Sequence, residues 1–327
     1  MRAKLEAALN RRWYGGVKPN PGLLAIAFLY YKLNQLRRFL YRKGILKSSK
    51  ISVPVIVVGN FTAGGTGKTP FTIALVQAMQ KRGWNPGVVS RGYGRESTDP
   101  VSVHAGSSAQ QCGDEPLLIH QRTKVAIRVD SNRVAAAEFL IQNGCNLIIA
   151  DDGLQHIRLQ RDLEIELIDH ERKYGNGMIL PAGPLREYPR PCDFKVANGS
   201  LEDDVVSHDY GMQLIYSDAE RLDASVQKNL KEFSGSKVNA IAGIGHPERF
   251  FNALMARGLN VNAIAFPDHH TYSTDDFPVD APILMTEKDA VKCRQLGLKD
   301  AWCIPVNAVL NETLFDTIDK KLKALSR

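Results

Sequence analysis

A glycine-rich turn follows an apolar, β-branched run (residues 55–58) and precedes a predicted helix; it contains Thr62, Ala63, Gly64, Gly65, Thr66, Gly67, Lys68 and Thr69. Its glycines allow successive N–H groups to turn inward around a phosphate. Lys68 would then reach the β- and γ-phosphates of a nucleotide, and the Thr69 hydroxyl would bind Mg²⁺. The strict motif has glycine where this chain has Thr62, which leaves a chance glycine turn as the alternative. The strand–turn–helix order favours a nucleotide-binding P-loop.

A second polar cluster follows the apolar run at residues 147–150 and contains Asp151, Asp152, Gln155 and His156. An acidic residue at the tip of a strand downstream of a P-loop can hold Mg²⁺ directly or through water. An ordinary acidic turn is the alternative. We therefore predict that Asp151 or Asp152 completes a metal site with Thr69.

Three other segments carry residue types suited to phosphate chemistry. Arg91 lies in the segment SRGYGR, after a short predicted strand whose carboxyl end suits ligand binding, although a plain surface loop is the alternative. Asp114 and Glu115 precede an apolar helix, where acids often act only as caps. Arg186 and Glu187 end a proline- and glycine-rich segment, and an arginine beside a P-loop could stabilise the charge of a transferring phosphate.

Tandem histidines, His269 and His270, follow Asp268 at the end of a predicted strand in the C-terminal part of the chain. A lone histidine would usually be structural, but the cluster DHHTY favours a functional role. Zinc is disfavoured, because no third His, Cys or Glu lies at a supporting spacing.

The elements that must position these residues alternate between strand and helix. A length of 327 residues suggests about two domains. We predict an N-terminal helical segment at residues 1–48, a P-loop core at 49–210 and a smaller α/β domain at 211–327. No apolar stretch is long enough to span a bilayer, and no signal peptide is apparent.

Positive charge is concentrated at the N-terminus. Residues 1–50 contain twelve Lys or Arg and one acid, a net charge of +11 against +7 for the whole chain, so the remainder is net acidic. Leu29, Leu33, Leu36 and Leu40 recur at helical spacing, with cations crowding the following turn and Gly44 as a stop. This pattern suits a helix lying in a membrane interface. A helix packed on the domain is the alternative, and nucleic-acid binding is disfavoured for lack of a motif.

The ordered motifs resemble those of the tetraacyldisaccharide 4′-kinase (lipid A 4′-kinase) family over nearly the whole chain. They are GN-F-TAGGTGKTP, SRGYGR, GDEP, DDG-L-QH, LPAGPLRE, GIGHPERFF, FPDHH-x-Y and TEKDAVK. The family's N-terminal segment is closer to Leu-Pro-Leu-Ser than the present GLLAIA. The resemblance implies a P-loop NTPase-like α/β/α sandwich with a second, smaller α/β/α domain. It also implies transfer of the ATP γ-phosphate, with Mg²⁺, to the 4′-hydroxyl of a lipid disaccharide 1-phosphate. By the same resemblance, the protein would act at the cytoplasmic face of a Gram-negative inner membrane.

Roles follow from the resemblance together with the chemistry of phosphoryl transfer. Asp114 would take the hydroxyl proton, His269 would orient it, Lys68 would hold phosphate and Arg186 would stabilise charge. Metal contacts are expected from Thr69, Asp151, Asp152 and Glu115. Substrate-binding or supporting positions are Asn60, Arg91, Gln155, His156, Glu187 and His270.

We expect a monomer that binds the membrane surface through its N-terminal helix and does not bind nucleic acid. Two rivals to the kinase remain at this level. One is a membrane-associated P-loop switch or assembly factor, although the N-K-x-D guanine motif has no match. The other is a nucleotide-gated membrane-binding module without transfer activity.

Overall fold

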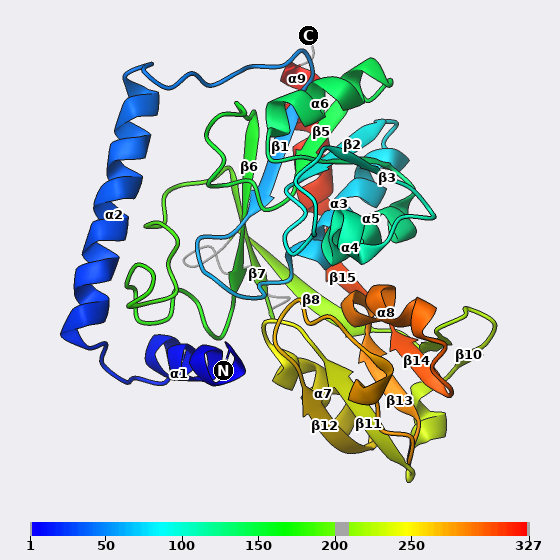
Figure 1. Cartoon of the computed structure of the whole chain (residues 1–327). Coiled ribbons are helices and arrows are strands. Elements are labelled where there is room, and N and C mark those ends of the chain that lie inside the picture. The colour runs from blue at the N-terminus through cyan, green and yellow to red at the C-terminus, as the bar shows by residue number, and fades with distance from the viewer. Residues whose placement is uncertain (1, 200–208, 326–327) are drawn as a thin grey trace.

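The larger sheet of the protein carries the P-loop at the end of its central strand. The computed structural model describes residues 2–199 and 209–325, and within them this sheet has nine strands in the order β15-β8-β7-β6-β1-β5-β2-β4-β3 (Figure 1). All pair in parallel except β3 and β15, which close the two edges antiparallel. The strands are β1 (Val55–Gly59), β2 (Pro86–Ser90), β3 (Val101–Val103), β4 (Ala126–Val129), β5 (Leu147–Ala150), β6 (Leu163–Asp169), β7 (Phe194–Asn198), β8 (Tyr210–Tyr216) and β15 (Val306–Leu310).

Helices cover both faces of this sheet. The central strands β1 and β5 are buried along their whole length, as their continuous apolar sequences require. One face packs on α3 (Lys68–Lys81), α5 (Asp114–Thr123) and α9 (Glu312–Leu325), and the other packs on α6 (Arg133–Gln142). A short helix, α4 (Ala109–Cys112), leads into α5. The result is an α/β/α sandwich.

A smaller sheet forms the second domain, with strands in the order β10-β9-β14-β13-β11-β12. Its two faces pack on α7 (Pro247–Met255) and α8 (Glu287–Cys293). Single 3₁₀ turns occur at Leu230–Phe233, Thr274–Asp276 and Arg294–Leu296. The strands are β9 (Ala219–Arg221), β10 (Gln227–Lys228), β11 (Lys237–Ala242), β12 (Asn260–Ala265), β13 (Ile283–Thr286) and β14 (Ala301–Ile304). The predicted α/β class with a second, smaller α/β domain is confirmed.

The chain passes between the two sheets next to the β8–β15 pair. β8 runs antiparallel to β15, with Tyr216 opposite Val306. Residues 306–325, which the sequence assigned to the smaller domain, therefore return to the larger one. There α9 packs against α3, and Trp84 Nε1 donates to Asp319 Oδ1 at 2.8 Å.

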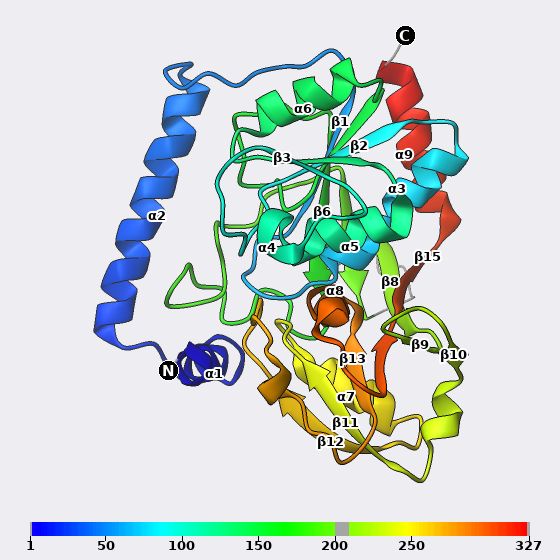
Figure 2. The ribbon, with the colours of Figure 1, turned by 45° about the vertical axis from the view of Figure 1, so that its right-hand side comes forward.

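Two helices form an N-terminal arm beside the larger domain: α1 (Arg2–Tyr14) and α2 (Pro21–Arg42). Both ribbon views show α2 standing along one side of that domain, with loops between it and the sheet (Figures 1 and 2). The predicted helix is thus confirmed and ends just before Gly44, whereas α1 was not predicted. Across the described residues, no helix is both long and apolar enough to cross a membrane.

The apolar stripe of α2 faces outward, and not toward the domain. Leu29, Leu33 and Leu36 are more than half exposed, and in this helix only Ala27 is classed as buried. Tyr30 and Tyr31 pack against the apolar cluster under the sheet. The sequence left open a helix packed on the domain, and the inward side of α2 does contact the domain through Tyr30 and Tyr31, whereas the leucine stripe does not.

Candidate active site

The P-loop turn joins β1 to α3 and leaves the first N–H groups of α3 without helical partners. Gly64 and Gly67 have φ of +111° and +87°, values that side chains rarely adopt. A Cβ on Gly67 would lie 2.7 Å from Asn198 Nδ2 and 3.0 Å from Met212 Cε, so only glycine fits there. The turn can bind an anion through its backbone, because orphan N–H groups and the helix dipole both favour negative charge.

Thr62 occupies the position of the missing first glycine without a left-handed turn. It forms an antiparallel bridge with Leu185, and the flanking bonds are Ala63 N to Pro184 O and Arg186 N to Phe61 O, both 2.7 Å. Asn60 Nδ2 also donates to the Thr62 carbonyl at 2.7 Å. The proline-rich segment therefore braces the first half of the P-loop in extended form, which explains why a β-branched residue is accommodated.

Asp152 lies directly after β5 and meets two cations of the site. Arg186 Nη1 donates to both of its carboxylate oxygens at 3.0 and 2.8 Å, and Lys68 Nζ lies 3.7 Å from Oδ1. Burial acts to raise the pKa of Asp152, but Lys68 and Arg186 outweigh it and hold the pKa below its usual range. Asp152 also has a φ of +47°, a conformation that costs free energy and is held by these contacts.

Asp151 points into the protein beside α3. Its side chain is 1% exposed and accepts a hydrogen bond from Thr72 Oγ1 at 3.2 Å. Burial raises its pKa to about 7, and the nearby charges of Glu115 and Asp152 add to the effect. A divalent cation would relieve this repulsion, so the acids fit Mg²⁺.

Within the described residues, no group of three His, Cys, Asp or Glu side chains is arranged to hold a metal on its own.

A hydrogen-bonded chain runs from Glu187 to Lys68. Gln155 Nε2 donates to Glu187 Oε1 at 3.2 Å and to the Asn60 carbonyl at 3.1 Å. Lys68 Nζ in turn donates to Asn60 Oδ1 at 3.2 Å. The structure thus links Lys68, which the sequence placed at the phosphates, to three residues predicted as substrate-binding or supporting positions.

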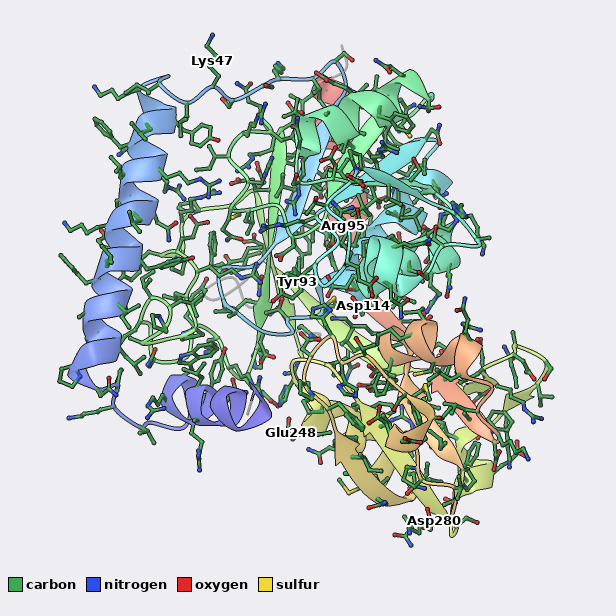
Figure 3. All side chains as sticks on the ribbon, viewed as in Figure 1. Lys47, Tyr93, Arg95, Asp114, Glu248 and Asp280 are labelled. Carbon is green, nitrogen blue, oxygen red and sulfur yellow. The ribbon has the colours of Figure 1, made fainter. Side chains whose placement is uncertain are left out.

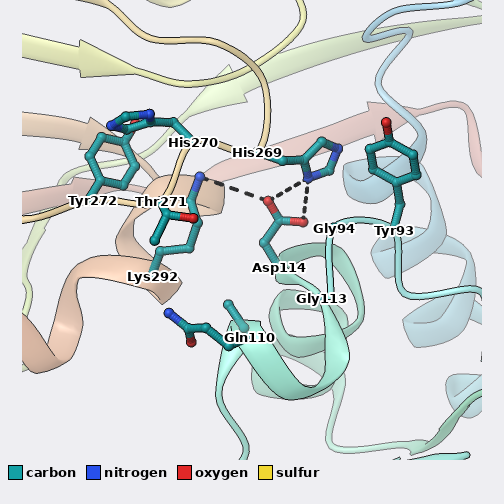
Figure 4. Close-up of a pocket in the computed structure, with 11 residues that line it drawn as sticks. Tyr93, Gly94, Gln110, Gly113, Asp114, His269, His270, Thr271, Tyr272 and Lys292 are labelled. Atoms are coloured by element: carbon teal, nitrogen blue, oxygen red, sulfur yellow. Dashed lines mark hydrogen bonds and ion pairs between the residues drawn. The ribbon is translucent and has the colours of Figure 1, made fainter. Parts of the chain in front are cut away.

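Asp114 and His269 meet across the domain boundary. Asp114 begins α5 in the larger domain, and His269 Nδ1 lies 3.0 and 3.1 Å from its two carboxylate oxygens (Figure 4). Both line a small pocket with residues of both domains, including Tyr93, whose ring centroid lies 4.8 Å from that of His269. Figure 3 shows Tyr93 and Asp114 where the larger domain faces the smaller one.

Two lysines of α8 surround this pair, and sequence reasoning assigned neither of them a role. Lys288 Nζ bonds Glu115 Oε1 at 3.0 Å and Asp268 Oδ1 at 3.1 Å, whereas Lys292 Nζ lies 3.9 Å from Asp114 Oδ2. Their i, i+4 spacing in TEKDAVK was the available signal, because such residues share one face of a helix.

The lysines and His269 keep Asp114 ionised. Burial acts to raise the pKa of Asp114, but Lys288 and the hydrogen bond from His269 outweigh it and lower the pKa to about 2. Burial alone would lower the pKa of Lys288, yet Glu115, Asp114 and Asp268 raise it well above its usual value. Lys288 therefore stays a cation between two acids of different domains.

The smaller domain also reaches the P-loop. A Cβ on Gly245 would lie 2.7 Å from Gly65 N, so the two backbones are in close contact. Arg249, on α7, forms an ion pair with Asp169 at the end of β6, with Nη1 2.9 Å from Oδ2. These contacts close the second domain over the phosphate cradle.

Three residues expected near the substrate lie in different surroundings. Arg91 is exposed, and His270 stacks on Phe266 at 4.5 Å and contacts Asp276 at 3.3 Å. Burial lowers the pKa of His156 to about 4, with nearby arginines adding to the effect. His270 lines the pocket beside Asp114, whereas His156 is part of the loop after β5.

The fold and this site together define a P-loop kinase. The chain belongs to the family described as tetraacyldisaccharide-1-P 4′-kinase, whose profile matches residues 20–323.

Two curated relatives support this assignment. A tetraacyldisaccharide 4′-kinase of Stenotrophomonas maltophilia is 46% identical over 325 residues, covering 96% of each chain. One from Xanthomonas euvesicatoria is also 46% identical, over 330 residues, covering 96% of this chain and 95% of its own. A crystal structure of LpxK from Aquifex aeolicus in complex with ATP superposes with a TM-score of 0.76 at 28% identity. It covers 91% of this chain and 98% of the other.

Proposed function

We propose that this chain transfers the γ-phosphate of ATP to the 4′-hydroxyl of a tetraacylated glucosamine disaccharide 1-phosphate. Tetraacyldisaccharide 4′-kinase activity in lipid A biosynthesis follows from the family. The proposal concerns the side chains that carry it out. The observation that carries it is the convergence of the P-loop, the Asp151–Asp152 turn and the Asp114–His269 pair between two domains.

The P-loop binds the triphosphate through its backbone N–H groups and Lys68. Thr69 and the acids Asp151 and Asp152 would hold Mg²⁺, with Glu115 as a further candidate ligand. Bound there, Mg²⁺ would supply positive charge to offset the negative charge that develops during transfer. Arg186 contributes positive charge beside Asp152 and stabilises the transferring group.

Asp114 accepts the proton of the sugar hydroxyl, and His269 orients it. A carboxylate with a pKa of about 2 is a weak base. Phosphoryl transfer passes through a loose transition state in most analyses, so positioning of the hydroxyl matters more than base strength. Because the two residues belong to different domains, domain closure completes the site and couples catalysis to substrate binding.

Further residues around the site support substrate binding. These are Asn60, Arg91, Gln155, His156, Glu187 and His270. Asn60 and Gln155 act through the bonds to Lys68 and Glu187 described above.

The outward face of α2 binds the cytoplasmic surface of the inner membrane, where the acceptor lies. The protein acts there as a peripheral membrane protein and as a monomer. Exposed Leu29, Leu33 and Leu36 would enter the interface, and Arg42 and Lys43 would meet anionic lipid headgroups.

Transfer of radiolabelled phosphate from ATP to the disaccharide acceptor in detergent tests the function. We expect labelled lipid that appears only with acceptor and protein together. ATP hydrolysis that ignores the acceptor would instead favour a membrane-associated switch.

A further inference from the structure

The inward face of α2 bonds to the same loops that hold the phosphate-handling side chains. Asn34 Nδ2 donates to the Arg186 carbonyl at 3.2 Å, and Arg37 Nη2 donates to the Gln155 carbonyl at 3.0 Å. Arg38 forms an ion pair with Glu187 through Nη1 and Oε2. All three contacts from the helix thus end on residues of the candidate active site.

These contacts continue by two short routes, one to the P-loop and one to Asp152. Arg38 holds Glu187, which accepts from Gln155, and Gln155 reaches Asn60 and so the Lys68 ammonium. Asn34 holds the backbone of Arg186, whose side chain pairs with Asp152. Each link is a hydrogen bond or an ion pair between neighbouring residues.

Burial makes the Arg38–Glu187 pair more than a surface contact. Glu187 is 9% exposed, and Arg38 is half-buried. Leaving a buried carboxylate without its cation costs free energy, so Glu187 would move or recruit another partner if Arg38 were removed. Tyr31 packs edge-on against Tyr188 at 5.4 Å and fixes the helix at the same place.

We propose that α2 is a positioning element of the phosphoryl-transfer site, with Arg38 and Asn34 as its positioning residues. The helix holds Glu187 and Arg186 so that Lys68 and the Arg186 guanidinium face the phosphates. The role extends the proposed function, because it assigns the inward face of α2 to catalysis and leaves only the outward face for lipid. The orientation of Lys68 and Arg186 then depends on the position of α2 against the larger domain.

The test uses the full chain with Arg38→Ala, Arg38→Lys and Asn34→Ala, and with Gln35→Ala as an exposed control on the same helix. Transfer rates are measured against acceptor concentration in detergent at saturating ATP. We expect Arg38→Ala to lower kcat roughly tenfold, the effect of removing one charge-assisted hydrogen bond. The KM for the acceptor should change little. Arg38→Lys should recover most of the loss because it restores the cation, and Gln35→Ala should match the unaltered chain.

ATP affinity without acceptor gives a second readout, measured by calorimetry. The affinity for ATP should weaken in Arg38→Ala because Lys68 loses its orientation. This readout does not depend on which acceptor the chain phosphorylates. Asn34→Ala removes only the hydrogen bond to the Arg186 carbonyl. It therefore tests the proposal if Arg38→Ala does not fold. The proposal is overturned if kcat and ATP affinity of folded Arg38→Ala or Asn34→Ala equal those of Gln35→Ala. If these variants lose only vesicle binding, with kcat and ATP affinity unchanged, α2 is a membrane anchor and the proposal is likewise overturned. Absence of any lipid product from the unaltered chain would reject the proposed function separately.

Discussion

His269 Nδ1 in the smaller domain lies within 3.1 Å of both carboxylate oxygens of Asp114 in the larger one. The two residues are 155 positions apart in the sequence, so only closure of the two domains brings them together. His269 has a φ of +60°, and Gly94 packs against its side chain. A non-glycine residue held in this conformation is expected at a site where orientation of the side chain matters.

Replacement of Asp114 by Asn should remove the proton acceptor while keeping the size of the side chain. We expect kcat to fall by about 10²–10⁴, the usual contribution of a general base. The dissociation constant for ATP should change little, because Asp114 is not part of the P-loop. Steady-state kinetics and calorimetry check the two quantities. Glu312→Gln, an exposed acid in the first turn of α9, is the matched control. Weaker ATP binding with normal turnover at saturation would reject the assignment.

Removal of the Lys288 ammonium should separate the domains. Lys288→Met leaves half-buried Glu115 and Asp268 without their shared cation. We expect a loss of about 1–3 kcal/mol in unfolding free energy, the cost of leaving such groups unpaired. Denaturant unfolding measures the loss, and small-angle scattering should report a more open molecule. Lys299→Met, at an exposed lysine of the same domain, is the control. A closed, equally stable Lys288→Met variant would show that the lysine does not join the domains.

Substitution of Gly67 should damage nucleotide binding more than its backbone strain alone predicts. Gly67→Ala combines a positive φ with a clash against Asn198, and it lies in the phosphate cradle. Gly83→Ala is the matched control, because Gly83 has a φ of +88° with nothing within 4 Å of its Cβ. Both should lose about 1–2 kcal/mol of stability from strain. Only Gly67→Ala should also weaken ATP binding, as measured by calorimetry, and equal affinities in the two variants would contradict this.

Local patterns predicted the P-loop and the Asp151–Asp152 turn, because each is a short segment at the end of a buried strand. Motif resemblance, and not spacing, paired Asp114 with His269. The contacts of Lys288 and Lys292 were missed because the i, i+4 spacing places both on one helix face but does not identify the acids that they meet after folding. Return of residues 306–325 to the larger sheet was also missed, since a strand's own sequence does not identify its partner.

Glu164 should make the loop after β5 sensitive to acid. Its carboxylate pairs with Arg190 and Arg161, and Arg161 also donates to the His156 carbonyl at 2.6 Å. Burial acts to raise the pKa of Glu164, but the arginines outweigh it and lower the pKa. Its stabilising effect is therefore present above the unfolded pKa of about 4.3 and is lost as the pH falls through the lower folded value.

Glu164→Gln should accordingly reduce the unfolding free energy at pH 7 by roughly 1–2 kcal/mol and make progressively less difference as the pH falls below about 4.3. Denaturant titrations at several pH values measure this difference. Glu138→Gln, at an exposed acid of α6, should show no such pH dependence. A constant difference between Glu164→Gln and the unaltered chain across the pH range would mean that packing, and not charge, is responsible.

The outward face of α2 should be required for membrane association. Leu29, Leu33 and Leu36 are 60, 58 and 53% exposed. A contiguous exposed apolar surface of this kind marks a site of interaction with a membrane or a partner. Changing all three to Asn should abolish sedimentation with anionic phospholipid vesicles, because burial of each leucine contributes about 1.5–3 kcal/mol. Deletion of residues 1–45 should do the same.

The triple variant should melt at the same temperature as the unaltered chain, since these side chains support no packing in the domain. Asn at Val226 and Val279, two exposed valines of the smaller domain, should leave vesicle binding intact. If the triple variant sediments normally, the outward face of α2 is not the membrane contact.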